Sequence, residues 1–189
     1  MLAVAGGCAH QSTDPIEADS DRALRAVAQS FSVTGKIGVS NAGKGYNGSL
    51  RWRQTGGELD MTVQGPIGIG RTRLYGESDR VEIENARGEV VVYHNPEEAL
   101  LTHLGFTVPL QALRYWVAGV PDPGMPAGPL VPKSDLPGAR RFAQAGWDVE
   151  VQALRTYDSG TLPRKLALSK GATRVKLILS TWQVPATVH

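Results

Sequence analysis

Cysteine is almost absent from the sequence, long apolar runs are missing, and neither sign of charge dominates. One cysteine among 189 residues excludes a disulfide within the chain. The 20 lysines and arginines nearly balance the 18 aspartates and glutamates, which leaves a net charge of +2 at pH 7. Because the sequence also shows no basic stripe, we do not expect a nucleic-acid partner. No apolar run approaches the roughly 18 residues that a membrane-spanning helix needs.

The sequence motifs of common enzymes and metalloproteins are also lacking. The four histidines show no His-x-x-x-His spacing and a single cysteine cannot form Cys-x-x-Cys, so we expect no structural zinc site. There is no Gly-x-Ser-x-Gly nucleophile motif and no glycine-rich phosphate loop before a helix. We therefore expect a protein that is not an enzyme and uses no metal or cofactor.

Glycine and proline are abundant, with 22 and 12 residues, and they favour many turns between short strands. Between these turns apolar and polar residues alternate. This period of two predicts antiparallel strands that have one buried and one wet face. The clearest alternating segments are 31–39, 46–53, 58–64, 81–84, 147–152, 165–168 and 175–182.

Three segments show helical spacing instead, and we predict helices over 21–31, 96–105 and 109–118. A proline-rich stretch, 119–139, is predicted to be an irregular surface loop. The total is ten or eleven strands and about three helices. One antiparallel sheet of that size tends to curl, and the apolar middle helices would lie against its concave face. Such an arrangement can enclose an apolar ligand cavity.

The N-terminus carries the pattern of a bacterial lipoprotein. An apolar stretch that ends in small residues precedes Cys8, as a signal-peptide cleavage site requires. We therefore predict a signal-peptide remnant over 1–7, a lipidated tether over 8–20 that begins at Cys8, and one half-barrel domain over 21–189. The alternatives are a free cysteine in a frayed terminus and a chance match.

The segment 64–70 joins two predicted strands and is rich in glycine and proline. It places Ile67 between Pro66 and Gly68, so an apolar side chain is expected at the tip of the loop. Exposed apolar tips often contact a membrane or a partner. The alternative is that Ile67 folds back onto the core.

Taken in order, several segments from residue 31 to 183 resemble the LolB family of outer-membrane lipoprotein receptors. The matching segments are GKIGV (35–39), GSLRWRQ (48–54), GPIG (65–68), LGFTVPL (104–110), LRYWVAGVP (113–121), QAGW (144–147), LP (162–163) and a closing strand that ends at Trp182. The resemblance implies a mainly β fold, an incomplete antiparallel barrel of eleven strands whose helices lid a hydrophobic cavity.

The resemblance also implies a function. Such proteins receive lipoproteins from the periplasmic carrier LolA and place them in the outer membrane without nucleotide or metal. It implies that Pro66, Ile67 and Gly68 form the membrane-insertion loop, and that lipid on Cys8 anchors the chain to the periplasmic face of the outer membrane. The expected partners are a LolA-like carrier, lipoprotein acyl chains and outer-membrane lipid, and we expect a monomer.

Seven apolar residues are our candidates for lining or bordering the acyl-chain cavity. They are Leu50, Trp52, Met61, Leu113, Trp116, Trp147 and Leu177. The main alternative function is an envelope lipoprotein with a similar half-barrel that shuttles glycolipid or senses stress. An acyl esterase would need a grouped nucleophile, base and oxyanion donors, which the sequence does not show. A purely structural lipoprotein is the remaining alternative.

Overall fold

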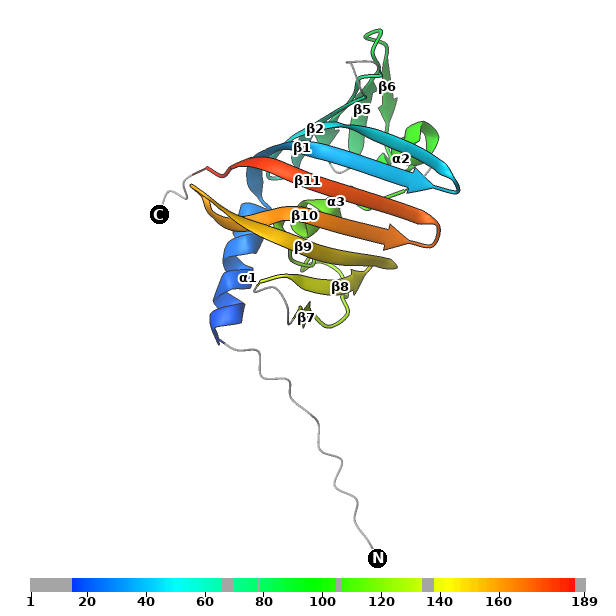
Figure 1. The fold of residues 1–189 in the computed structure, drawn as a ribbon. Helices are drawn as coiled ribbons and strands as arrows, with labels where there is room; N and C mark the ends of the chain where they lie inside the picture. The colour runs from blue at the N-terminus through cyan, green and yellow to red at the C-terminus, as the bar shows by residue number, and fades with distance from the viewer. Residues whose placement is uncertain (1–14, 66–69, 78, 105–106, 134–137, 186–189) are drawn as a thin grey trace, which may run out of the picture.

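A computed structural model describes residues 15–65, 70–77, 79–104, 107–133 and 138–185 (Figure 1). The helices are α1 (Pro15–Val27), α2 (Pro96–Leu104) and α3 (Leu110–Ala118). The strands are β1 (Ser30–Asn41), β2 (Lys44–Thr55), β3 (Glu58–Gln64), β4 (Thr72–Glu77), β5 (Arg80–Glu84), β6 (Val90–Tyr93), β7 (Val131–Pro132), β8 (Arg140–Gln144), β9 (Trp147–Tyr157), β10 (Gly160–Lys170) and β11 (Thr173–Gln183). None of the helices among the described residues is long and apolar enough to cross a membrane.

All eleven strands form one antiparallel sheet, in the order β6-β5-β4-β3-β2-β1-β11-β10-β9-β8-β7. The sheet is open, because β6 and β7 lie at its two edges and do not pair with each other. Its centre is the pairing of β1 with β11, which joins the two ends of the chain. The predicted fold class, a mainly β half-barrel with three helices, is confirmed.

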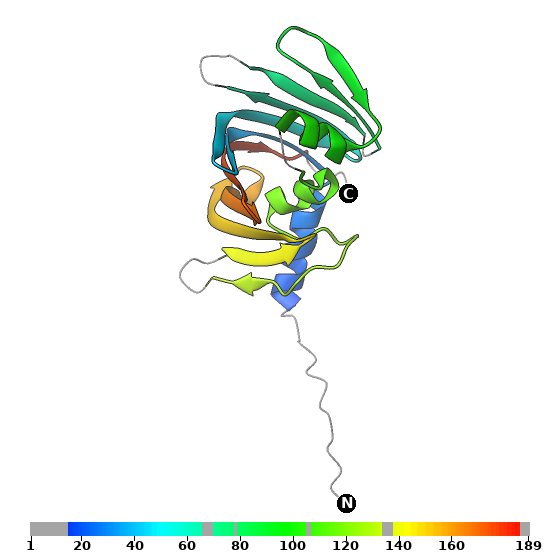
Figure 2. The same ribbon diagram turned by 90° about the vertical axis from the view of Figure 1, so that its right-hand side faces the viewer.

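The sheet curves around α2 and α3, which lie on its concave side (Figure 2). Alternation decides which side chains face these helices. In β2 the side chains of Leu50 and Trp52 are buried, whereas Arg51 and Arg53 are exposed on the convex face. The inward side chains of both halves of the sheet join those of α2 and α3 in one apolar core.

A bulge in the central pair of strands adds to the curvature. The register between β1 and β11 shifts between Thr34 and Gly35, and bulges of this kind bend and twist a strand. A Cβ atom on Gly35 would lie 2.2 Å from the carbonyl oxygen of Ile178. Only glycine therefore allows this close approach of the two backbones.

The first helix differs from the prediction at both ends. It begins at Pro15, not at residue 21, so the second part of the predicted tether is helical. Proline is favoured at the first position of a helix, which explains the earlier start. The helix ends at Val27, and Phe31 belongs to β1. There the Phe31 ring packs 5.1 Å from the ring of Trp52, as an inward residue of the sheet.

The other two helices match the predictions closely. Asn95 caps α2 by accepting the backbone N–H of Glu97 at 2.9 Å, and Pro96 takes the first helical position. α3 follows Pro109 and ends at Ala118, and it is capped by Gly119, whose left-handed backbone (φ 91°) suits glycine. The described part of the predicted loop over 119–139 is irregular apart from β7 and one isolated bridge between Ala127 and Gln144.

Candidate functional site

The seven cavity candidates lie together in the apolar core between the sheet and the helices. They come from β2, β3, α3, β9 and β11, and each is at most 8% exposed. None of the seven lines any of four hollows found among the described residues. The structure therefore brings the candidates together as a packed core, and their contact with an acyl chain stays a prediction.

A buried glutamine fixes α3 in this core. The Trp116 indole N–H donates to Oε1 of Gln144 at 2.7 Å, and the backbone N–H of Asp122 donates to the same oxygen at 2.9 Å. Nε2 of Gln144 donates to the carbonyl oxygens of Asp122 and Met125 at 2.8 and 3.0 Å. This network ties α3 to β8 and to the loop after α3, so α3 cannot move without breaking buried hydrogen bonds.

Sequence reasoning missed Gln144 as a functional residue, although one signal was present. Gln144 follows Phe142 at an inward position of the alternating pattern, where a polar side chain needs buried partners. The partners themselves come from a distant part of the chain and could not be read from the local pattern.

One tryptophan in the core differs from the others in its hydrogen bonding. Trp52 donates to Gln54 at 3.1 Å and Trp182 to the carbonyl oxygen of Pro163 at 2.9 Å. The indole nitrogen of Trp147 is buried and has no acceptor among the described residues. Its ring lies 6.3 Å from that of Trp116. An unsatisfied buried donor costs about 1–3 kcal/mol, so a ligand carbonyl at this point would gain a hydrogen bond.

A hollow leads toward the core between the two lid helices. It has a volume of about 360 Å³ and lies between the β2–β3 turn and the first turns of α2 and α3. Leu59 and Leu110 line it and also belong to the core. Arg114 of α3 also lines this hollow. Its Nη1 atom donates to the carbonyl oxygen of Gly56 at 2.6 Å, which holds α3 against the β2–β3 turn.

The lipidation and insertion residues lie outside the described part of the chain. This applies to Cys8 and to Pro66, Ile67 and Gly68. The strands on either side of the insertion segment are described: β3 is followed by the buried Gly65, and β4 begins at Thr72.

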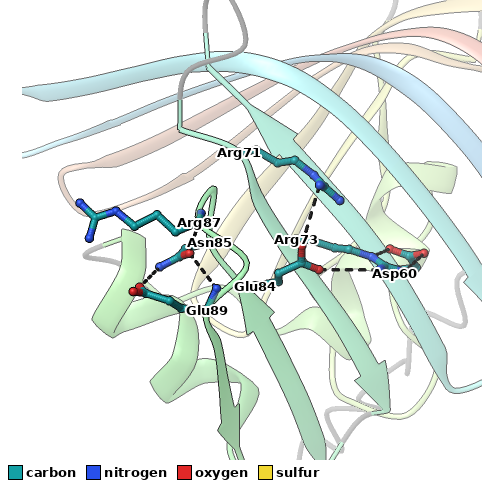
Figure 3. Close-up of polar contacts among 7 residues, drawn as sticks. All are labelled: Asp60, Arg71, Arg73, Glu84, Asn85, Arg87 and Glu89. Atoms are coloured by element: carbon teal, nitrogen blue, oxygen red, sulfur yellow. Dashed lines mark hydrogen bonds and ion pairs between the residues drawn. The ribbon is translucent and has the colours of Figure 1, made fainter.

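Ion pairs on the convex face brace these two strands (Figure 3). Arg73 of β4 donates to both carboxylate oxygens of Asp60 of β3, each at 2.9 Å. Glu84 of β5 lies 3.8 Å from Arg71 and 3.9 Å from Arg73. The hydrogen bond from Arg73 lowers the pKa of Asp60 below its usual range, and the positive charges of Arg73, Arg53 and Arg71 act in the same direction.

This ion pair predicts a small, pH-dependent contribution to stability. Because the pKa of Asp60 is lowered in the folded state, its contribution is present above the unfolded value of about 4 and is lost as pH falls through the folded value. Both side chains are about one third exposed, so Asp60→Asn should cost only about 0.5 kcal/mol at neutral pH. Urea unfolding measures this at neutral pH and near pH 3. The free energy of unfolding of Asp60→Asn should be lower than that of the parent at neutral pH, and the difference should disappear in acid.

Asp148→Asn is the matched control, because Asp148 is an exposed strand carboxylate with no ion pair to a described residue. If Asp60→Asn lowers the free energy of unfolding equally at both pH values, the pH-dependent contribution cannot be assigned to the ion pair.

Comparison with known proteins places the chain in a family. The family model described as outer membrane lipoprotein LolB matches residues 29–182. The outer-membrane lipoprotein LolB of Nitrosococcus oceani is 32% identical over 92% of this chain and 86% of its own length. That of Halorhodospira halophila is 33% identical over 84% of this chain and 77% of its own length.

Solved structures support the fold alone, because their sequence identities are low. A LolA superfamily protein from Nitrosomonas europaea aligns with a TM-score of 0.51 at 7% identity, over 89% of this chain and 94% of its own. A DUF1329 family protein from Desulfovibrio piger aligns with a TM-score of 0.52 at 10% identity, over 94% and 96% of the two chains. The family model spans most of the described sheet and both lid helices, and the chain belongs to the outer membrane lipoprotein LolB family.

Proposed function

We propose that this protein accepts lipoproteins from a LolA-type periplasmic carrier and inserts them into the outer membrane. The acyl chains enter the apolar core between the curved sheet and the helices α2 and α3, and they leave through the membrane contact of the Pro66–Gly68 segment. One observation carries the proposal: a chain of the LolB family gathers all seven candidate cavity residues into one core under two lid helices. This role needs no catalytic step, metal or cofactor.

In this proposal an acyl chain enters between α2 and α3. The hollow between their first turns gives access to Leu59 and Leu110, which are part of the core. Since the core is packed, one helix must move to admit the chain. The hydrogen bonds of Trp116 and Arg114 hold α3, whereas the buried side chains of α2 in the core are Ala99 and Leu100 alone among its described residues. We assign the movement to α2.

The unpaired indole of Trp147 supplies one polar contact for the cargo. A lipoprotein carries acyl chains through ester carbonyls, which accept hydrogen bonds. The buried Trp147 N–H has no acceptor among the described residues and lies beside Trp116 of α3. We assign to it the role of donating to a cargo carbonyl, which positions the head of the cargo against the sheet.

Transfer of this kind needs no energy source if the affinity for acyl chains rises at each step. A tenfold difference in affinity is about 1.4 kcal/mol. This is less than the contribution of two methylene groups, at about 0.8 kcal/mol each. Slightly better burial here than in the carrier, and complete burial in the bilayer, would therefore drive the transfer forward.

The test is a transfer assay with the full chain carrying Cys8→Ser. A labelled lipoprotein bound to a LolA-type carrier is mixed with the protein, liposomes are added, and the label is followed by fractionation. We expect the label to move first to this protein and then to the liposomes.

Two other outcomes would overturn the proposal. Label that stays on the carrier while a fluorescent fatty acid still binds would indicate an envelope lipid-binding protein with another client. Label that stays on the carrier without fatty-acid binding would show that the core does not open to acyl chains.

A further inference from the structure

On the convex face of the sheet, the central strands carry positive side chains and no negative ones, and this separation cannot be seen in the sequence. The four central strands β10, β11, β1 and β2 hold nine lysines and arginines and no aspartate or glutamate. All nine are exposed, and six of them alternate with inward residues and so face the convex side; we call these six the basic face: Lys36, Arg51, Arg53, Lys165, Arg174 and Lys176. The sequence itself shows no basic stripe, and the basic face forms because strand pairing joins segments from the two ends of the chain (Figure 1).

A hollow of about 530 Å³ lies on this basic face, across β11, β1, β2 and β3. The register sets Lys36 between Ile178 and Ser49, and it sets Gly38 between Lys176 and Asn47. Gly38 has no side chain, and the Asn47 side chain lies over it: a Cβ atom on Gly38 would stand 2.8 Å from Oδ1 of Asn47.

The hollow reaches the root of the proposed insertion segment. Gln64 at the end of β3 and Gly65 after it are both among its lining residues, and Pro66 follows directly. Whatever binds in this hollow therefore lies beside the point where the chain leaves the sheet toward Ile67.

The two lysines of the hollow are not neutralised by carboxylates. Lys36 donates to Oγ of Ser49 at 3.1 Å, and Lys176 has no hydrogen bond or ion pair with any described residue. No acidic residue is among the described residues that line the hollow. On the neighbouring strands β3 to β5 the positive charge is neutralised, because Arg73 forms ion pairs with Asp60 and Glu84 (Figure 3).

This combination of groups suits the phosphate of a lipid headgroup. Two ammonium groups attract an anion, and the amide of Asn47 and the hydroxyl of Ser49 can donate hydrogen bonds to its oxygens. Ile178, which is 45% exposed, lies in the same hollow and offers an apolar contact for the part of the lipid next to the phosphate. A flat basic surface without such a hollow would bind a phospholipid headgroup no more tightly than any other anion.

We infer that the hollow between Lys36 and Lys176 binds the phosphate of an anionic phospholipid in the target membrane, and thereby brings the chain after Gly65 to the bilayer. The inference rests on the proposed function, because the bound headgroup would hold the target membrane next to the proposed insertion segment. Docking through the headgroup precedes insertion of the apolar tip, and high salt weakens it.

The test measures binding of the full chain with Cys8→Ser to phosphatidylcholine vesicles, with and without phosphatidylglycerol, by sedimentation. Each lysine near an anionic bilayer strengthens binding roughly fivefold. Lys36→Gln with Lys176→Gln should therefore weaken binding to the anionic vesicles by about thirtyfold. Binding to the neutral vesicles should not change, and the thermal unfolding curve should stay the same because both side chains are exposed.

Arg141→Gln with Arg155→Gln is the matched control. It removes the same charge from exposed residues of β8 and β9, and neither of these strands pairs with a strand that lines the hollow. We expect it to change anionic binding by less than about threefold. An equal loss in both double variants would overturn the inference in favour of net charge, and parent-like binding of the lysine variant would overturn it outright.

A second readout separates this inference from the proposed function. Ile67→Glu removes the apolar tip and leaves the hollow intact, so it should still bind anionic vesicles. If the carrier transfers no lipoprotein to the parent but the lysine variant still loses vesicle binding, the proposed function fails and the headgroup site stands. If transfer succeeds and the lysine variant binds vesicles normally, the headgroup site fails alone.

Discussion

Ile67→Glu is expected to reduce the delivery of lipoproteins into liposomes by about a hundredfold, while uptake from the carrier stays near the parent level. A carboxylate in the hydrocarbon region costs roughly 3 kcal/mol relative to an aliphatic side chain, which corresponds to about two orders of magnitude. The seven candidate cavity residues are unchanged, because they come from β2, β3, α3, β9 and β11. Ile67 lies outside the described residues, so this prediction depends on the GPIG segment and on the family resemblance.

The controls separate loss of the apolar tip from a general effect of charge. Ile67→Leu keeps an aliphatic side chain and should deliver lipoproteins like the parent. Val131→Glu places the same charge on a valine that is 48% exposed in β7, at one edge of the sheet. It should deliver normally. Normal delivery by Ile67→Glu would remove Ile67 from the mechanism, and defective delivery by Val131→Glu would mean that added charge alone is harmful.

Local alternation predicted most of the sheet because each central strand has one buried and one wet face. Leu50 and Trp52 face the core, whereas Arg51 and Arg53 face solvent, as a period of two requires. β6 was not predicted, since its four residues Val90–Tyr93 are all apolar and show no alternation. It is an edge strand with three valines more than 40% exposed, so neither face is fully buried.

The parts of the site that could not be predicted depend on contacts between distant segments. The pairing of β1 with β11, which creates the basic face, joins residues that no local pattern links. The same holds for Trp116 and Gln144, whose hydrogen bond joins α3 to β8. The sequence predicts that the seven candidate residues line or border a cavity, and the structure places them in one buried core whose packing depends on contacts between the helices and the sheet.

Trp116→Ala is expected to lower the free energy of unfolding by about 4 kcal/mol. The Trp116 side chain is completely buried, so its loss leaves a void beside Trp147. Gln144 also loses one of the two donors to Oε1, although the backbone N–H of Asp122 remains. The loss is a large share of the 5–15 kcal/mol that stabilises an ordinary domain, and urea unfolding followed by fluorescence of the remaining tryptophans measures it.

A fatty acid should restore much of this lost stability if the core is the acyl-chain site. In the parent a chain must displace packed side chains, whereas in Trp116→Ala it fills space that is already open. A ligand at a hundred times its dissociation constant stabilises the folded state by about 2.7 kcal/mol. Phe142→Ala is the control, because Phe142 is an equally buried aromatic residue of β8 outside the seven candidates. Its loss of stability should be similar, but a fatty acid should restore little of it. Equal recovery in both variants would show that any void in this core takes up fatty acid, and no recovery in Trp116→Ala would move the acyl chain away from α3.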